Sequence, residues 1–311
     1  MDSKENIKSE SIFIPVNDTD TLHLKRFYSD SNGQPIFMVH GSIENGKIFY
    51  SSSGKGLAPY LALQGFDVFV ADLRGRGEST PPIGKGSTHG LAEIIKEDLP
   101  AFIKKIQEIK GDVPQHWISH SWGGVHFLCY LARNMDAVNL ASMVFYASKR
   151  KISIISFRRF YMIDFFWNFM SKIYTSIYGY LPATGIKMGS DNETIKSHRQ
   201  TNDWVYSEDW IDWEDGFDYS TALKQLNLPP ILSLTGEGDD VLGHPTDVKF
   251  LLKEIGDQEY TFRIIGKSTG YKHNYDHINI LTHPDCTEDH FPEAVEWMMK
   301  HSEVEVKAEV G

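Results

Sequence analysis

One short stretch near the middle of the chain constrains the fold more than any other. It spans residues 117–124 and reads Trp-Ile-Ser-His-Ser-Trp-Gly-Gly, so an apolar run ends abruptly in small residues. Apolar residues then recur at helical spacing, at Val125, Leu128 and Leu131. This pattern is typical of a buried strand that turns sharply into a helix. We therefore expect helices packed on a sheet, with Ser121 at the apex of one turn.

The neighbours of Ser121 are those that a strained turn around a nucleophile requires. The spacing Ser119-x-Ser121-x-Gly123 matches a nucleophile elbow, with serine in place of the usual first glycine. Residues two before and two after the nucleophile must be small because the backbone there is crowded. The turn would expose the Ser121 hydroxyl and aim the free N–H groups of the new helix at its target. A tight turn without chemistry has similar residues, so other segments must decide.

Length, charge and cysteine content limit the classes of protein to which this chain can belong. The 311 residues suit one large α/β domain. The formal net charge of -11, without a basic cluster, argues against nucleic acid or anionic lipid as an electrostatic partner. Two cysteines, Cys129 and Cys286, make no disulfide framework and favour a reducing compartment. The charged first ten residues show no secretory signal, so we expect a cytoplasmic protein.

The remaining periodicity predicts alternating strands and helices. Residues 11–16 and 22–28 alternate apolar and polar residues and predict a hairpin that flanks the main sheet. Continuous apolar runs predict strands that are buried on both faces, as in a mostly parallel sheet flanked by helices. Besides the strand before Ser121, strands are expected at 36–39, 66–71, 140–147, 230–234 and 260–265, and helices at 48–63, 88–109, 244–255 and 287–300.

The alternation breaks after the sixth strand. Residues 149–226 are long, irregular and rich in Phe, Tyr and Trp, and we interpret them as an inserted helical lid. The core would then consist of residues 1–148 and 227–311. Charged residues interrupt the apolar part of the insertion, so no run of about 20 apolar residues exists to span a bilayer. The aromatic residues either line a pocket or form additional core.

Two further loops hold residues suited to assist a serine nucleophile. Acyl transfer through serine needs a base, a carboxylate that orients the base, and N–H donors for the oxyanion. His277 follows the last predicted strand, and Asp239 follows the strand before it. Asp240 is adjacent, and it is the alternative for the acid. The order serine, acid, histidine is the one expected when all three lie at the carboxyl edge of one sheet.

These motifs together resemble the α/β-hydrolase superfamily over nearly the whole chain. Besides the elbow and the two triad loops, the resemblance includes His40-Gly41 after the third strand and residues 72–79 after the fourth, which read Asp-Leu-Arg-Gly-Arg-Gly-Glu-Ser. The resemblance is to serine hydrolases with an inserted lid, such as lysophospholipases and esterases. It implies Ser121 as nucleophile, His277 as general base and Asp239 as acid.

The same resemblance implies the rest of the site and its chemistry. The backbone N–H groups of Ser42 and Trp122 would form the oxyanion hole. The expected reaction is cleavage of a small-molecule or lipid-like ester through an acyl-enzyme, with no cofactor and no metal. If the aromatic side chains of the insertion face the serine, they would line an apolar slot for acyl chains. A lid of this kind would also allow peripheral contact with a membrane. The sequence does not indicate an oligomeric state.

Several other functions are compatible with parts of the sequence. A thioesterase or acyltransferase would use the same triad, and an inactive hydrolase fold would serve as a binding module. Residues 41–48 nearly form a phosphate-binding loop, but Ile48 stands where a hydroxyl would bind magnesium. Four histidines near the C-terminus suggest a metal site, but they lack the helical spacing of a metal-binding pair. They are His273, His277, His283 and His290.

Overall fold

An eight-stranded, mostly parallel sheet organises the protein. The computed structural model describes residues 7–302. The strand order is β1-β2-β4-β3-β5-β6-β7-β8, with β1 and β2 antiparallel at one edge and parallel pairing from β4 to β8. The predicted flanking hairpin and parallel sheet are confirmed. The strands are β1 (Lys8–Pro15), β2 (Thr21–Tyr28), β3 (Pro35–Val39), β4 (Asp67–Asp72), β5 (Gln115–His120), β6 (Leu140–Tyr146), β7 (Ile231–Gly236) and β8 (Tyr260–Ile265).

Helices cover both faces of this sheet. All five residues of β3 are buried, and their side chains alternate between two core clusters. Phe37 and Val39 pack with α3 and α4, whereas Ile36 and Met38 pack with α1 and α11. The helices are α1 (Leu57–Leu63), α2 (Leu91–Glu93), α3 (Leu99–Lys110), α4 (Trp122–Asn134), α5 (Phe157–Arg159), α6 (Ser171–Tyr178), α7 (Ile195–Tyr206), α8 (Tyr219–Lys224), α9 (Pro245–Glu254), α10 (Asn279–Thr282) and α11 (Phe291–Ser302).

Two predicted helices are interrupted in the structure. The helix expected over 48–63 was wrong in its first half, because residues 51–56 form a turn in which Gly54 and Gly56 have positive φ. A Cβ on Gly56 would lie 2.4 Å from the Phe49 carbonyl oxygen, so only glycine fits in the turn that precedes α1. The helix expected over 88–109 contains a π-turn at Ile94–Asp98. Pro100 lies two residues after this turn and has no N–H to continue the α-helical ladder.

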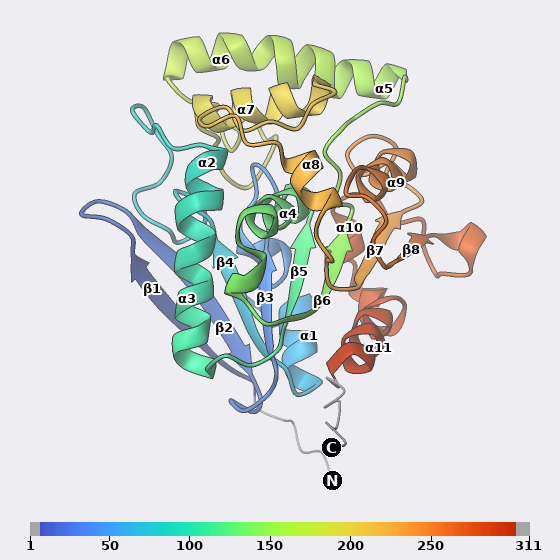
Figure 1. The fold of residues 1–311 in the computed structure, drawn as a ribbon. Coiled ribbons are helices and arrows are strands. Elements are labelled where there is room, and N and C mark those ends of the chain that lie inside the picture. Colours follow the sequence, from blue (N-terminus) through green and yellow to red (C-terminus); the bar gives the residue numbers. More distant parts are fainter. Residues whose placement is uncertain (1–6, 303–311) are drawn as a thin grey trace.

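Four helices lie between β6 and β7, where the sequence predicted an insertion. Residues 157–178 form one continuous outer helix made of α5, the π-helical turns Phe160–Met170 and α6. This outer helix lies at the top of Figure 1, beyond the ends toward which the parallel strands point, with α7 beneath it. An ion pair of 2.6 Å between buried Arg76 and Glu193 ties the insertion to the loop after β4. Within residues 7–302, no helix is long and apolar enough to cross a bilayer.

Candidate active site

Ser121 occupies a strained turn between β5 and α4. Its backbone has φ 52° and ψ −120°, a conformation that non-glycine residues rarely adopt. The Ser121 N–H donates to the Tyr146 carbonyl oxygen at 2.8 Å, which fixes the turn to β6. Such strain persists only where the surrounding structure enforces it, and it is frequent at nucleophiles. The predicted sharp strand-to-helix turn is therefore present.

Close packing explains the small residues of this turn. A Cβ on Gly123 would lie 2.2 Å from the Val39 carbonyl oxygen. The Ser119 hydroxyl, in place of the usual glycine, lies 3.3 Å from the Ser148 hydroxyl. It fits because Gly124 has no side chain: a Cβ there would lie 2.4 Å from Ser148 Oγ and 2.9 Å from Ser119 Oγ.

The structure brings Ser121, His277 and Asp239 together in one hydrogen-bonded chain. His277 Nε2 lies 3.0 Å from Ser121 Oγ, and His277 Nδ1 lies 2.6 Å from Asp239 Oδ2. All three residues are buried. Asp240 points elsewhere: its largely exposed carboxylate pairs with Arg158 of α5 at 2.7 Å. Of the two candidate acids, Asp239 is therefore the one that contacts the imidazole.

Comparison with known proteins agrees with this fold. A family model described as alpha/beta hydrolase fold matches residues 34–174, which include β3 to β6 and the turn at Ser121. The chain has the α/β-hydrolase fold. No curated protein matches the sequence.

Several solved structures share this fold across nearly the whole chain at low identity. An esterase from Exiguobacterium antarcticum aligns with a TM-score of 0.61 and 15% identity, covering 93% of this chain and 100% of that one. A thermophilic esterase from Thermogutta terrifontis gives 0.57 and 15%, covering 94% and 100%. A membrane phospholipase A, described as a bacterial virulence factor, gives 0.61 and 14%, covering 95% and 87%.

In the candidate triad of this hydrolase fold, burial and the Asp239 carboxylate shift the pKa of His277 in opposite directions. Burial lowers the pKa of His277 below its usual value, although the Asp239 carboxylate opposes that shift. Burial alone would raise the pKa of Asp239, but the charge and hydrogen bond of His277 outweigh it and lower that pKa to about 2. Near neutral pH the imidazole is thus neutral and can accept the Ser121 proton, while Asp239 stays ionised.

A second buried pair, which the sequence analysis missed, braces the same loops. His120 Nδ1 lies 2.8 Å from Glu44 Oε2, and His120 Nε2 lies 2.8 Å from the His277 carbonyl oxygen. Glu44 also accepts the Gly41 N–H at 3.0 Å. The pair therefore connects the loop after β3, the elbow and the loop that holds His277. Both residues lie inside motifs that the sequence singled out, but only the fold brings them together.

The loop after β3 lies against the nucleophile, where the superfamily places its oxyanion hole. A Cβ on Gly41 would lie 2.8 Å from the Ser121 Cβ. Glu44 takes the Gly41 N–H, whereas within residues 7–302 the Ser42 N–H has no hydrogen-bond acceptor. Trp122 is the first residue of α4, so its N–H lacks an intrahelical partner. These positions fit the predicted donors, Ser42 and Trp122.

The rival sites from the sequence have other partners in the structure. In the phosphate-loop candidate, the Gly46 N–H donates to Asp72 Oδ1 at 2.7 Å, so a carboxylate occupies the place a phosphate would need. His290 is buried and lies 2.8 Å from the Ile280 carbonyl oxygen. His273 and His283 lie near Asp285 on a half-buried surface, separate from His277. Both nitrogens of His277 already face Ser121 and Asp239.

The apolar side chains of the outer helix lie on two faces, one buried and one exposed. Ile163 is buried in the core cluster that includes Trp122 and Trp204. An outer stripe at every fourth position is exposed by 38 to 84%. It consists of Phe157, Tyr161, Phe165, Phe169, Ile173 and Ile177. These six side chains face outward and do not line a buried slot beside Ser121.

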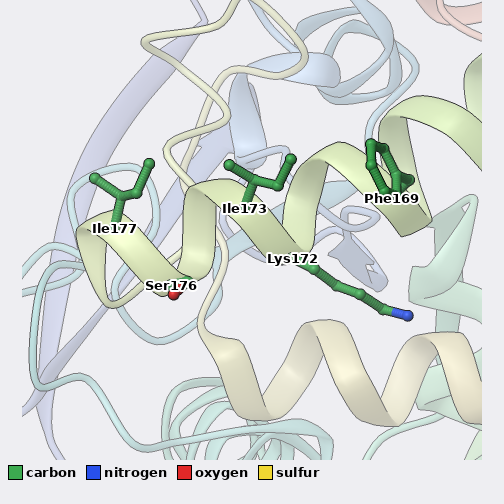
Figure 2. A pocket seen from close by; sticks show the side chains of 5 residues that line it. All are labelled: Phe169, Lys172, Ile173, Ser176 and Ile177. Carbon is green, nitrogen blue, oxygen red and sulfur yellow. The ribbon is translucent and has the colours of Figure 1, made fainter.

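An open hollow lies along the end of this helix. It is lined by Phe169, Lys172, Ile173, Ser176 and Ile177, all from the outer helix (Figure 2). In Figure 2 the apolar side chains point to one side, whereas Lys172 and Ser176 point toward the helix below. Both residues also line a second hollow together with residues of α7. The outer stripe is thus a continuous apolar surface rather than a closed pocket.

Proposed function

We propose that this protein hydrolyses carboxylic esters through a Ser-His-Asp acyl-enzyme mechanism. The observation that carries the proposal is the buried chain from Ser121 Oγ to His277 Nε2 at 3.0 Å and from His277 Nδ1 to Asp239 at 2.6 Å. Serine becomes an effective nucleophile when an oriented base takes its proton. The esterases and the phospholipase with the same fold support this reaction class.

Each group has a defined step in the proposed reaction. His277 takes the Ser121 proton as Oγ attacks the ester carbonyl carbon, and the backbone N–H groups of Ser42 and Trp122 stabilise the oxyanion. The C–O bond then breaks, and His277 returns the proton to the departing alcohol. Water, activated by the same imidazole, attacks the acyl-enzyme and releases the acid. Asp239 holds the imidazole in the required tautomer throughout.

Purified enzyme and p-nitrophenyl butyrate test the reaction. Wild-type protein should release p-nitrophenol, and Ser121→Ala should lower kcat by roughly 10³- to 10⁶-fold with its fold intact. A thioesterase or acyltransferase would instead favour thioester substrates or transfer the acyl group to an added alcohol. An inactive binding module would turn over none of these substrates in either form of the protein.

We further propose that the insertion is a lid that binds a lipid surface and that the ester is apolar or lipid-like. Exposed apolar surfaces of this extent on a helix mark interaction sites. Aromatic and aliphatic side chains on one face suit insertion at the boundary between headgroups and acyl chains. The exposed charged residues of the outer helix, Arg158 and Lys172, are both cationic, although the whole chain carries a net charge of -11. Arg158 is paired with Asp240 and Lys172 points toward the helix below, so the proposed attraction to a lipid surface rests on the apolar stripe itself.

Co-sedimentation with phosphatidylcholine vesicles tests this surface. Wild-type protein should sediment with the vesicles, and Phe169→Asp should reduce the bound fraction because a charge enters the outer stripe. Phe13→Asp is the matched control, since Phe13 is similarly exposed but lies on β1. Equal binding of the two variants would contradict the proposal. A dimer that dissociates only in Phe169→Asp would assign the stripe to a second copy of the chain instead.

A further inference from the structure

A lysine that the proposed reaction does not use contacts the nucleophile. Lys149 lies just after β6, at the edge where the parallel strands end, and its side chain is buried. Its ammonium donates a hydrogen bond to Ser121 Oγ at 3.2 Å. Ser121 can accept this bond and still donate its own proton to His277, so the contact is compatible with the triad.

This ammonium is buried without a carboxylate partner. Among residues 7–302 it forms no ion pair, although Asp239, Glu44 and Asp247 lie near enough to attract it. The next two residues differ: Arg150 pairs with Glu254, and Lys151 pairs with Glu208 at 2.7 Å.

A buried ammonium can donate three hydrogen bonds, and among residues 7–302 Lys149 uses one of them. Burying a charge is costly unless it is paired. Burial accordingly lowers the pKa of Lys149 to about 8, which still leaves most molecules charged near neutral pH. The remaining donors beside Ser121 are therefore suited to an anion that arrives with the substrate.

We propose that Lys149 binds a carboxylate of the substrate, placed within two or three bonds of the scissile ester. The spacing follows from the contact itself. Ser121 Oγ bonds to the carbonyl carbon during the reaction, and Lys149 Nζ is 3.2 Å from that oxygen. A carboxylate within hydrogen-bond reach of the ammonium must therefore be close to the same carbon. The inference rests on the proposed esterase function and adds a polar requirement to its substrate: an ester with an apolar part that also carries an acidic group beside the bond that is cleaved.

The acidic group can belong to either side of the ester, so the test uses a matched pair for each. Monoethyl succinate and ethyl succinamate differ only by carboxylate against primary amide on the acyl side. Carboxymethyl butyrate and carbamoylmethyl butyrate make the same comparison on the alcohol side. Hydrolysis of each is followed by titration of the released acid, and the quantity compared is the acid-to-amide ratio of kcat/KM.

We expect wild-type enzyme to prefer the acid in at least one pair by roughly tenfold to a hundredfold, as for a charge-assisted hydrogen bond. In Lys149→Gln this ratio should fall to near one, whereas Lys149→Arg should retain part of it. Lys151→Gln is the matched control, two residues away with its own carboxylate partner, and should keep the wild-type ratio. Raising the pH from about 7 to about 9 should also lower the wild-type ratio, because the Lys149 ammonium loses its proton.

Several results would overturn the inference. An acid-to-amide ratio near one in the wild type, or a ratio unchanged in Lys149→Gln, would show that the ammonium does not bind a substrate carboxylate. An equal loss on acid and amide would mean that Lys149 acts on Ser121 itself. The pH dependence of the acid-to-amide ratio in the wild type tests the role of the Lys149 ammonium even if a variant fails to fold. Failure of the esterase proposal is distinguishable, because the wild type would then hydrolyse neither member of any pair.

Discussion

Exchanging each of two adjacent aspartates for asparagine separates a catalytic carboxylate from a surface one. Asp239 is buried, and its Oδ2 accepts a hydrogen bond from His277 Nδ1 at 2.6 Å. An asparagine can turn its NH₂ group toward Nδ1, which stabilises the tautomer with the proton on Nε2. That tautomer cannot accept the Ser121 proton. We therefore expect Asp239→Asn to lower kcat about 10⁴-fold, which corresponds to about 5.4 kcal/mol at about 1.36 kcal/mol per tenfold.

Asp240 provides the matched control at the next position. Its exposed ion pair with Arg158 belongs to a class that contributes about 1 kcal/mol or less, so Asp240→Asn should change kcat by no more than about fivefold. The assay is the steady-state hydrolysis of p-nitrophenyl butyrate, with thermal unfolding of each variant as a check on folding. Equal losses in the two variants, or the larger loss in Asp240→Asn, would refute the assignment of the acid.

Three further predictions follow from the site and the insertion. Because burial lowers the pKa of His277, kcat/KM should stay high as the pH falls to about 6.5 and decline only below it, with protonation of the base; a midpoint above that pH in the pH–rate profile would contradict this. If an apolar chain binds beside the serine, kcat/KM for p-nitrophenyl esters should rise roughly three- to fourfold per added carbon from acetate until the site is filled, since each buried methylene contributes about 0.8 kcal/mol; a maximum at acetate would exclude a lipid-like ester. Glu44→Gln removes the charged partner of buried His120 and should lower the free energy of unfolding by about 3 kcal/mol in a denaturant titration, whereas a loss under about 0.5 kcal/mol would mean that this pair does not brace the loops.

The parts of the fold that could be predicted from sequence are those with a simple periodicity. The run at residues 36–39 is apolar throughout because β3 is covered by helices on both faces. The turn at Ser121 was predictable because its backbone tolerates only small neighbours. The structure shows which atoms a Cβ on Gly123 or Gly124 would approach too closely. The first half of the helix expected at 48–63 was wrong because apolar spacing takes no account of the positive φ values of Gly54 and Gly56.

The candidate site was predictable only where its residues belong to local motifs. Motif position, three residues after Gly236, favoured Asp239 over the adjacent Asp240, and the structure separates the two by burial and by partner. Lys149 was treated as the start of the insertion, although its position directly after a strand was a usable signal for the same sheet edge. The direction of the outer stripe could not be predicted, because aromatic residues in a helical pattern suit a core, a pocket or an exposed surface equally well.

Covalent trapping of the nucleophile tests the central claim most directly. A fluorophosphonate probe reacts with an activated serine, and mass spectrometry of the digested protein identifies the residue that carries it. Our account predicts a single modified peptide that contains Ser121, with labelling abolished in Ser121→Ala and strongly slowed in Asp239→Asn. Labelling at another serine, or undiminished labelling of Ser121→Ala, would contradict the account.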